Sequence, residues 1–365
     1  MITPDVSPGH RLDLKRYREI FLVFAGCISL LIALLILENS RGRHFVIKSA
    51  TPYCNWLIFS SIILAISIFL VTFYTYNQIV NGRLAIAGFT FLVSGVFDSI
   101  YLISYPVNPD ISGIVVPSGQ TIMYWLLARV VNACGFLMLV SMKDHKKSRL
   151  GRFWRLVISF LLIAAGILFV EFSNGLASHL FGPEGLKLSG NIIIAIVAAI
   201  YGYNTIRAVL DFGKKDDPLY KTLTCAFTIM FFCQVITIGL VSMHDIRTIL
   251  ACVLKFVAFV LFFYVFYIQG IKRPFVLLSK AKEELNEYAY ELDRLVDKRT
   301  HELKQVNKRL MADLEVARGI QQAMLPSSLP QNEYVSFVSG YLPAENLSGD
   351  FYNVIKIDDS HFGVY

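Results

Sequence analysis

An acidic turn near the end of the chain is the first feature with evident chemistry. Asp350 follows Gly349 within AENLSGDFYNVIKIDDSHFGVY, which covers residues 344–365. A carboxylate at a tight glycine turn can bind Mg²⁺ or Mn²⁺, and such an ion polarises phosphoryl oxygens and activates a bound water. Asp358 and Asp359 follow, but Asp-Asp-Ser between two strands is typical of a hairpin turn. We therefore predict Asp350 as the metal ligand and catalytic carboxylate of this stretch.

The residues around Asp350 resemble part of a known enzyme family. LEVARGIQQAMLPSSLP (314–330) and GYLPAENLSGDFYN (340–353) are similar to the start of the bacterial serine phosphatases of the RsbU and SpoIIE type, a branch of the metal-dependent PPM fold. The matching residues are Ala317, Ile320, Gln321, Met324, Leu325, Pro326, Tyr341, Pro343, Ala344, Gly349, Asp350, Phe351 and Tyr352, while Ser348 and Asn353 depart from the pattern. The resemblance implies Mg²⁺- or Mn²⁺-dependent hydrolysis of phosphoserine on a regulatory protein, such as an anti-sigma-factor antagonist.

The sequence is expected to hold only the start of such a domain. The family supplies its further metal ligands after the strand HFGVY, and this sequence ends there, at Tyr365. One carboxylate holds Mg²⁺ or Mn²⁺ poorly, and a domain of this kind needs on the order of 200 residues, of which about forty are present. We therefore predict little or no phosphatase activity from these 365 residues alone.

A second set of informative residues lies inside apolar segments. At about 1.5 Å per helical residue, Asp98 and Arg129 lie about 10 to 12 Å from the same membrane surface, and Lys255 lies at a similar depth. A charge in hydrocarbon is costly, so each should face a partner or water. Asp98 and Arg129 can pair between adjacent antiparallel helices, with the hydroxyl of Tyr101 one turn away. The group is either a sensory site or a structural ion pair beside a lysine that extends to the surface.

These segments resemble a family of membrane sensors. IAGFTFLVSGVFDSIYLISYP (86–106) followed by YWLLARVVNACGF (124–136) is similar to the domains called membrane-associated sensor type three. In that family a glycine-rich span with an Asp-x-x-His pair precedes an aromatic-x-x-x-Arg span, and Tyr101 stands here where His is common. The resemblance covers residues 15–270 and implies a sensor without defining its ligand.

Membrane helices must position these residues. Hydrophobic residues make up 55% of the chain and charged residues 17%, which is typical of a membrane protein. The net charge of +7 comes from Lys and Arg between apolar runs, so we expect no nucleic-acid partner. We predict a membrane domain over 20–270 with eight transmembrane helices, near 20–37, 56–74, 84–105, 121–142, 156–172, 189–210, 222–241 and 249–268.

Basic residues beside the spans predict the orientation. They precede the first span at 11–18, and they crowd the segment 143–155 between the fourth and fifth spans. Such segments stay in the cytoplasm. The opposite loop 106–120 has no Lys or Arg, although the first outer loop carries basic residues within 41–48. We predict a multi-pass protein of the inner (plasma) membrane with both termini cytoplasmic, the N-terminal segment being 1–19.

A charged helix without a break is predicted over 274–325, where Pro326 and Pro330 end it. Its apolar residues keep a 3–4 alternation, which indicates a parallel two-stranded coiled coil, and an extra residue after Arg299 resembles a stutter. The seam residues are Leu278, Ala281, Leu285, Tyr288, Leu292, Leu295, Arg299, Leu303, Val306, Leu310, Leu314, Ala317 and Gln321. We expect a homodimer through this segment, and a solvated single helix is the alternative.

The residues 331–365 are rich in aromatic and β-branched types separated by turn residues, which predicts short strands. The fold class is therefore an α-helical membrane bundle, then a coiled-coil helix and the N-terminal strands of an α/β PPM-type domain. We expect a sensor in the lipid bilayer that controls a cytoplasmic phosphatase through the helix. Two alternatives stay open, a multi-pass transporter with a regulatory tail and a catalytically inactive receptor that signals through its dimeric helix.

Overall fold

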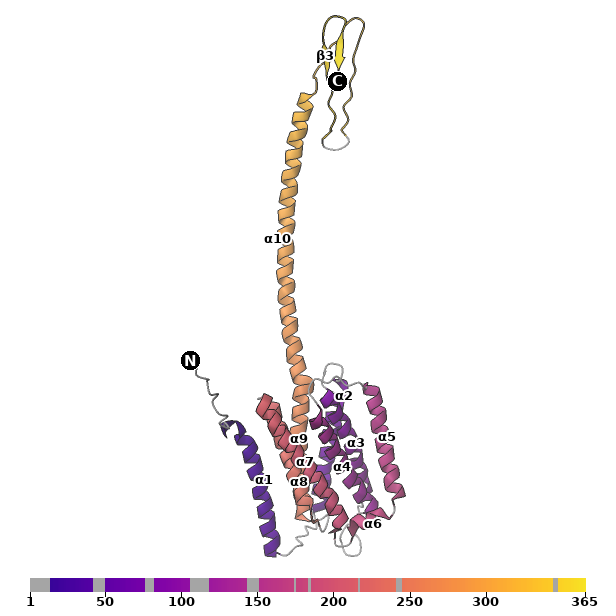
Figure 1. Ribbon diagram of the computed structural model, residues 1–365, viewed down its shortest axis with the longest axis vertical. Coiled ribbons are helices and arrows are strands. Elements are labelled where there is room, and N and C mark those ends of the chain that lie inside the picture. The colour runs from indigo at the N-terminus through magenta and orange to yellow at the C-terminus, as the bar shows by residue number, and fades with distance from the viewer. Residues whose placement is uncertain are drawn as a thin grey trace, which may run out of the picture. The chain divides into compact units, whose positions relative to one another are not determined.

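Helices make up most of the chain, as the computed structural model shows (Figure 1). The structure describes residues 14–41, 50–75, 82–105, 118–142, 151–173, 175–182, 185–215, 217–240, 245–343 and 347–365. The chain divides after Leu277 into two compact units, Met1–Leu277 and Leu278–Tyr365.

Long apolar helices form at the eight segments predicted as membrane spans. Within the described residues they are α1 (Leu14–Arg41), α2 (Ala50–Tyr74), α3 (Gly82–Ser104), α4 (Gly119–Ser141), α5 (Arg152–Phe172), α7 (Leu188–Lys215), α8 (Pro218–Thr237) and α9 (Ile246–Tyr267). Each contains a stretch that is long and apolar enough to cross a bilayer. Several extend beyond the predicted spans, because the apolar run marks only the part of a helix that lies in hydrocarbon. The predicted helical membrane bundle is confirmed.

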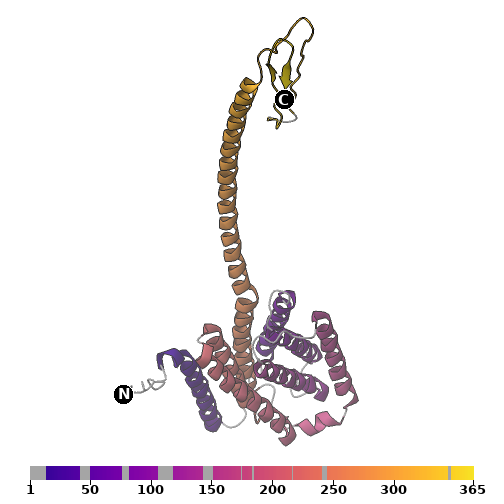
Figure 2. The ribbon, with the colours of Figure 1, turned by 45° about the horizontal axis from the view of Figure 1, so that its top comes forward.

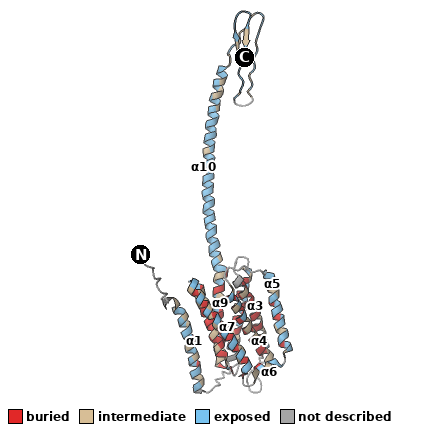
Figure 3. Cartoon of the chain, in the orientation of Figure 1, coloured by how far each residue is buried: buried red, intermediate tan, exposed pale blue. Residues whose placement is uncertain are grey.

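The bundle has a packed centre and an exposed periphery. α3 packs against α2 and α4, α8 packs against α7 and α9, and α2 packs against α9; the long helices lie side by side in both ribbon views (Figure 2). Phe91, Phe136, Phe227 and Phe262 bring α3, α4, α8 and α9 together, with contacting ring centroids 4.6 to 5.8 Å apart. α1 and α5 are mostly exposed (Figure 3). Their apolar outer faces suit contact with lipid.

α3 and α4 approach each other closely at a glycine. A Cβ atom added at Gly135 would lie 2.1 Å from Oγ1 of Thr90 on α3. Small residues at such crossings let helix backbones approach, so their van der Waals contacts can stabilise a membrane bundle. Gly135 is therefore part of the packing that positions Arg129, which lies on the same helix.

Replacing Gly135 with Ala is expected to destabilise the bundle by about 1–3 kcal/mol, since the new methyl group must displace Thr90. Thermal unfolding in detergent measures the change. Gly26→Ala is the matched control, because nothing lies within 4 Å of a Cβ at Gly26 of α1. Equal melting temperatures for the two variants would contradict the close approach.

A short connection follows α5 that the sequence did not predict. It contains α6 (Leu176–Leu180) and the two-residue strands β1 (Phe181–Gly182) and β2 (Gly185–Leu186), which pair antiparallel. The backbone N–H of Leu186 also donates to the carbonyl of Leu240, which follows α8, over 2.8 Å. Elements this short carry no hydrophobic period, so pattern analysis does not detect them.

A π-helical turn joins the bundle helix α9 to the long charged helix. η1 (Ile268–Lys272) follows α9 and leads directly into α10 (Arg273–Met324). Arg273 forms a bidentate ion pair with Asp217, the N-cap of α8, with Nη1 2.9 Å from Oδ2 and Nη2 2.7 Å from Oδ1. Burial raises the pKa of Asp217, but the hydrogen bonds from Arg273 and from the Leu219 N–H outweigh it and hold that pKa below its ordinary value. The start of α10 is thus tied to the start of α8.

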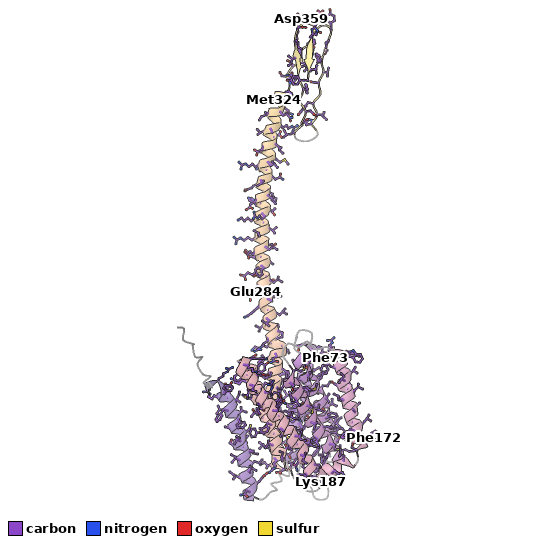
Figure 4. All side chains as sticks on the ribbon, in the orientation of Figure 1. Phe73, Phe172, Lys187, Glu284, Met324 and Asp359 are labelled. Carbon is purple, nitrogen blue, oxygen red and sulfur yellow. The ribbon has the colours of Figure 1, made fainter. Side chains whose placement is uncertain are left out.

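The predicted charged helix 274–325 forms as α10, which has no buried residue. Its side chains extend away from the helix from Glu284 to Met324 (Figure 4), and the apolar seam residues from Leu278 to Leu310 are exposed. Close to its end, Gln321 exchanges two hydrogen bonds with the backbone of Ser348, as its Nε2 donates to the Ser348 carbonyl and its Oε1 accepts from the Ser348 N–H.

Among the described residues of 331–365, regular strands are limited to one hairpin. β3 (Val354–Lys356) pairs antiparallel with β4 (Phe362–Val364). In the turn between them the Asp358 carboxylate accepts from the Ser360 N–H at 2.9 Å and lies 2.8 Å from Nδ1 of His361, so the Asp-Asp-Ser segment forms the expected hairpin. The prediction of several strands is met only in part, because β propensity alone does not form a strand where no pairing partner lies alongside.

Candidate functional site

The ionisable residues predicted inside the membrane helices are all buried in the bundle. The exposed fraction is 2% for Asp98 on α3, 8% for Arg129 on α4 and 9% for Lys255 on α9. Tyr101, one turn after Asp98, is also buried. The bundle therefore holds charges in its interior, where each must be matched by a polar or charged partner.

Asp98 is paired with Lys255. Lys255 Nζ donates to Asp98 Oδ2 over 2.6 Å, which joins α3 to α9. The predicted pairing of Asp98 with Arg129 is wrong, and so is the alternative in which Lys255 extends to the surface. The order of the spans places Asp98 and Arg129 on neighbouring helices, but the helix rotation turns Asp98 toward α9, whose Phe259 ring lies 5.2 Å from that of Phe91 on α3.

Arg129 has neutral partners instead. Its Nη1 donates to Oε1 of Gln234 on α8 over 2.6 Å, and its guanidinium carbon lies 4.1 Å from the ring centroid of Trp125. The stacking on Trp125, one turn earlier on α4, is a cation–π contact. Nε of Arg129 and Nε2 of Gln234 are buried without a hydrogen-bond partner in the part of the chain that the structure describes. Arg129 thus links α4 to α8 with its charge still uncompensated.

Arg129 and Tyr101 line a small cavity at one end of the bundle. α2, α4 and α9 begin at this end and α3 and α8 end there, and the wall includes Asn55, Trp125 and Cys252. The cavity volume is about 20 Å³, enough for about one water. Tyr101 packs edge-on against Tyr105 with ring centroids 5.7 Å apart, and no hydrogen bond joins its hydroxyl to Asp98 among the described residues. Tyr101 therefore belongs to the cavity rather than to the ion pair.

Sequence reasoning missed the neutral members of this site. Gln234 is fully buried, and an amide within an apolar span was a usable signal that a polar partner faces it. Trp125 lies four residues before Arg129 on the same helix face, which the spacing already indicated. Cys54 and Cys252 both line the cavity, where α2 meets α9, and no local pattern reveals that meeting.

The bundle matches a known family. Residues 55–274 match MASE3, described as a membrane-associated sensor domain, over more than half of the chain. This chain belongs to the MASE3 family. It is a multi-pass membrane protein of signal transduction. Asp98, Arg129, Gln234 and Lys255 all lie within the MASE3 region. No curated protein and no solved structure matches the chain.

The MASE3 region begins later than the resemblance predicted. It starts in α2, so α1 lies outside it, whereas an extent of 15–270 was expected. α1 is joined to the MASE3 helices by Glu38, whose carboxylate pairs with Nε and Nη2 of Arg247 in α9. Arg247 Nη1 also donates to the carbonyl of Ile238 over 2.7 Å. A second ion pair, between Glu19 of α1 and Lys221 of α8 at 2.7 Å, also ties α1 to the matched helices.

The predicted metal ligand Asp350 lies in an exposed turn. Its N–H donates to Oγ of Ser348 at 3.1 Å, and its Oδ2 lies 3.4 Å from the same oxygen. No group of three His, Cys, Asp or Glu side chains placed to hold a metal ion occurs in the described residues. The catalytic and metal roles of Asp350 stay predictions.

Proposed function

We propose that this chain is a membrane sensor in which the buried Asp98, Lys255, Arg129 and Gln234 control the packing of the bundle, and in which α10 passes that state to a C-terminal output segment. The observation that carries the proposal is the Asp98–Lys255 pair, because it joins α3 to α9 and α9 continues through η1 into α10. A change at the pair can thereby reach α10 along one helix. Membership of MASE3 favours a sensor over a transporter.

The η1 turn and the Arg273–Asp217 pair support this route. π turns inside α-helices occur frequently at functional sites, since the extra residue changes the helix register locally. Arg273 holds the start of α10 against α8 while Lys255 holds α9 against α3. If α9 can adopt two arrangements that differ in helix register at η1, α10 would be rotated or shifted along its axis between them. Helix shifts of this kind are a recognised form of conformational switching.

The basic residues support an orientation in the inner membrane with cytoplasmic termini. Lys214 and Lys215 at the end of α7 and Lys272 with Arg273 after α9 lie at the same end of the bundle as the start of α1. Cytoplasmic segments are enriched in such residues. The cavity beside Arg129 lies at the opposite end and would face the outside.

Two copies of α10 would form the transmitting element. The seam keeps its 3–4 spacing through most of the 52-residue helix, and its leucines from Leu278 to Leu310 are exposed in the single chain. Leu285, Leu292 and Leu310 are examples. Because exposed apolar area at this spacing is buried by a parallel second helix, a homodimer accounts for the pattern better than a solvated single helix does.

The output segment would be the start of a PPM-type serine phosphatase. Supporting this, the two hydrogen bonds of Gln321 hold the helix motif directly beside the Ser348–Asp350 turn, so the two parts of the resemblance meet in space. A phosphoserine on a regulatory protein is the substrate that the resemblance implies. The same helix would then set the position of Asp350 for its metal.

We expect the 365-residue chain alone to release no phosphate from a phosphoserine protein in the presence of Mn²⁺, since Asp350 has no further ligand close by among the described residues. Phosphate release is measured with the purified chain, and Asp350→Ala serves as the control. Turnover that Asp350→Ala abolishes would contradict the expectation.

A further inference from the structure

The charges of the buried site do not balance. Asp98 and Lys255 neutralise each other, whereas Arg129 has only the neutral amide oxygen of Gln234 as acceptor in the described part of the chain. A buried guanidinium without a counter-ion is strongly unfavourable, and stacking on Trp125 compensates only part of that cost. A single water in the cavity could accept a hydrogen bond but could not cancel the charge. An anion is the group that the site lacks.

The unused donors of Arg129 define the shape of that anion. Nη1 is occupied by Gln234, while Nε is buried and has no hydrogen-bond partner among the described residues. Nε and Nη2 lie on one edge of the planar guanidinium and donate in parallel. This edge matches the two oxygens of a carboxylate or a similar planar oxyanion, which it binds with two hydrogen bonds. A spherical ion has no pair of oxygens to match the two donors, so it binds this edge less well than a planar oxyanion does.

The cavity wall fits an anion. Arg129 is part of it, and no Asp or Glu belongs to the wall in the described residues. Tyr101 and Tyr105 add hydroxyl groups and Asn55 adds an amide, all of which can donate to an oxyanion. The volume of about 20 Å³ holds about one water, so even formate, with three heavy atoms, requires the helices around the cavity to separate slightly.

We propose that the cavity binds a small planar oxyanion, carboxylate or inorganic, on the Nε–Nη2 edge of Arg129. This inference rests on the proposed sensor function and names its ligand class. Because α2, α4 and α9 all contribute to the wall, an occupant larger than the cavity must displace them, and α9 continues into α10. A larger ligand would thereby displace α9, and with it the start of α10, further than a smaller ligand does.

The test is the melting temperature of the purified full chain in detergent with sodium formate, sodium nitrate or sodium chloride at equal ionic strength. We expect a saturable rise with formate, since a ligand that binds the folded state stabilises it. A rise with formate alone identifies a carboxylate site, and a rise with formate and nitrate identifies a general planar-oxyanion site; both support the proposal. An equal rise with chloride, or no rise with formate, would overturn it.

Trp125 provides a local readout. The chain has three tryptophans, so Trp56→Phe with Trp154→Phe leaves Trp125 as the only one. Its fluorescence should change with formate at the concentration that shifts the melting temperature. Arg129→Lys, which keeps the charge but loses the planar edge, should weaken the formate response about tenfold or more. If this variant does not fold, the formate titration of the chain with Arg129 still tests the proposal. Formate that raises the melting temperature without changing Trp125 fluorescence would show that the anion binds elsewhere, which would overturn the proposal.

Discussion

Replacing Lys255 with Met is expected to lower the free energy of unfolding of the bundle by about 3–5 kcal/mol. The substitution removes the only charged partner that the described residues offer to Asp98, whose side chain is almost completely buried. An unpaired carboxylate in this environment must either remain charged without compensation or take up a proton at a cost in free energy. Unfolding of the purified chain in detergent by heat or denaturant measures the loss.

Two further variants separate the pair from the effects of substitution. Lys187→Met makes the same change at an exposed lysine whose hydrogen bond, within the described residues, goes to the carbonyl of Ser178, and it should cost less than about 1 kcal/mol. Asp98→Asn combined with Lys255→Met removes both charges, so it should recover most of the stability that Lys255→Met loses. A double variant no more stable than Lys255→Met alone would contradict the pairing.

Replacing Leu292 and Leu295 together with Glu is expected to abolish the homodimer through α10. Both side chains lie on the apolar seam and are exposed in the single chain, so a dimer would bury them. Burial of each leucine contributes about 1.5–3 kcal/mol per chain, and four carboxylates facing one another across the seam would add repulsion. Crosslinking of α10 in membranes measures the dimer fraction.

Tyr290→Glu is the matched control for the seam variant. Tyr290 is also exposed but lies on the opposite side of the heptad pattern, outside the seam. Its replacement should leave the dimer fraction unchanged. A dimer fraction that survives the change at Leu292 and Leu295, or one that falls as far with Tyr290→Glu, would favour a single solvated helix.

The sequence predicts the helices well and their partners poorly, for one physical reason. The length of an apolar run decides whether a helix crosses a bilayer, so all eight spans could be located. The depth of Asp98, Arg129 and Lys255 follows from the same count. The direction in which each side chain points depends on the rotation and packing of α3, α4, α8 and α9, which a single helix pattern does not contain. This is why Arg129 pairs with Gln234 and Asp98 with Lys255.

The C-terminal segment shows the same limit for strands. The Asp-Asp-Ser turn is a local signal, and the hairpin β3–β4 forms around it. The other predicted strands depend on pairing with distant segments, which composition cannot supply. The contact of Gln321 with Ser348 is likewise non-local, and only the family resemblance pointed to both residues.

The measurement that tests the coupling most directly is crosslinking at the seam in response to a change in the bundle. Leu292→Cys and Leu295→Cys, in separate chains, report two adjacent seam positions, and the chain without either substitution gives the background from the native cysteines. In membranes, the Asp98→Asn/Lys255→Met variant should shift the ratio of the two crosslinking rates, because release of α9 from α3 alters the register of α10. An unchanged ratio in the variant would contradict the proposed coupling between the buried pair and α10. Because no anion is added, this result does not depend on ligand binding at Arg129.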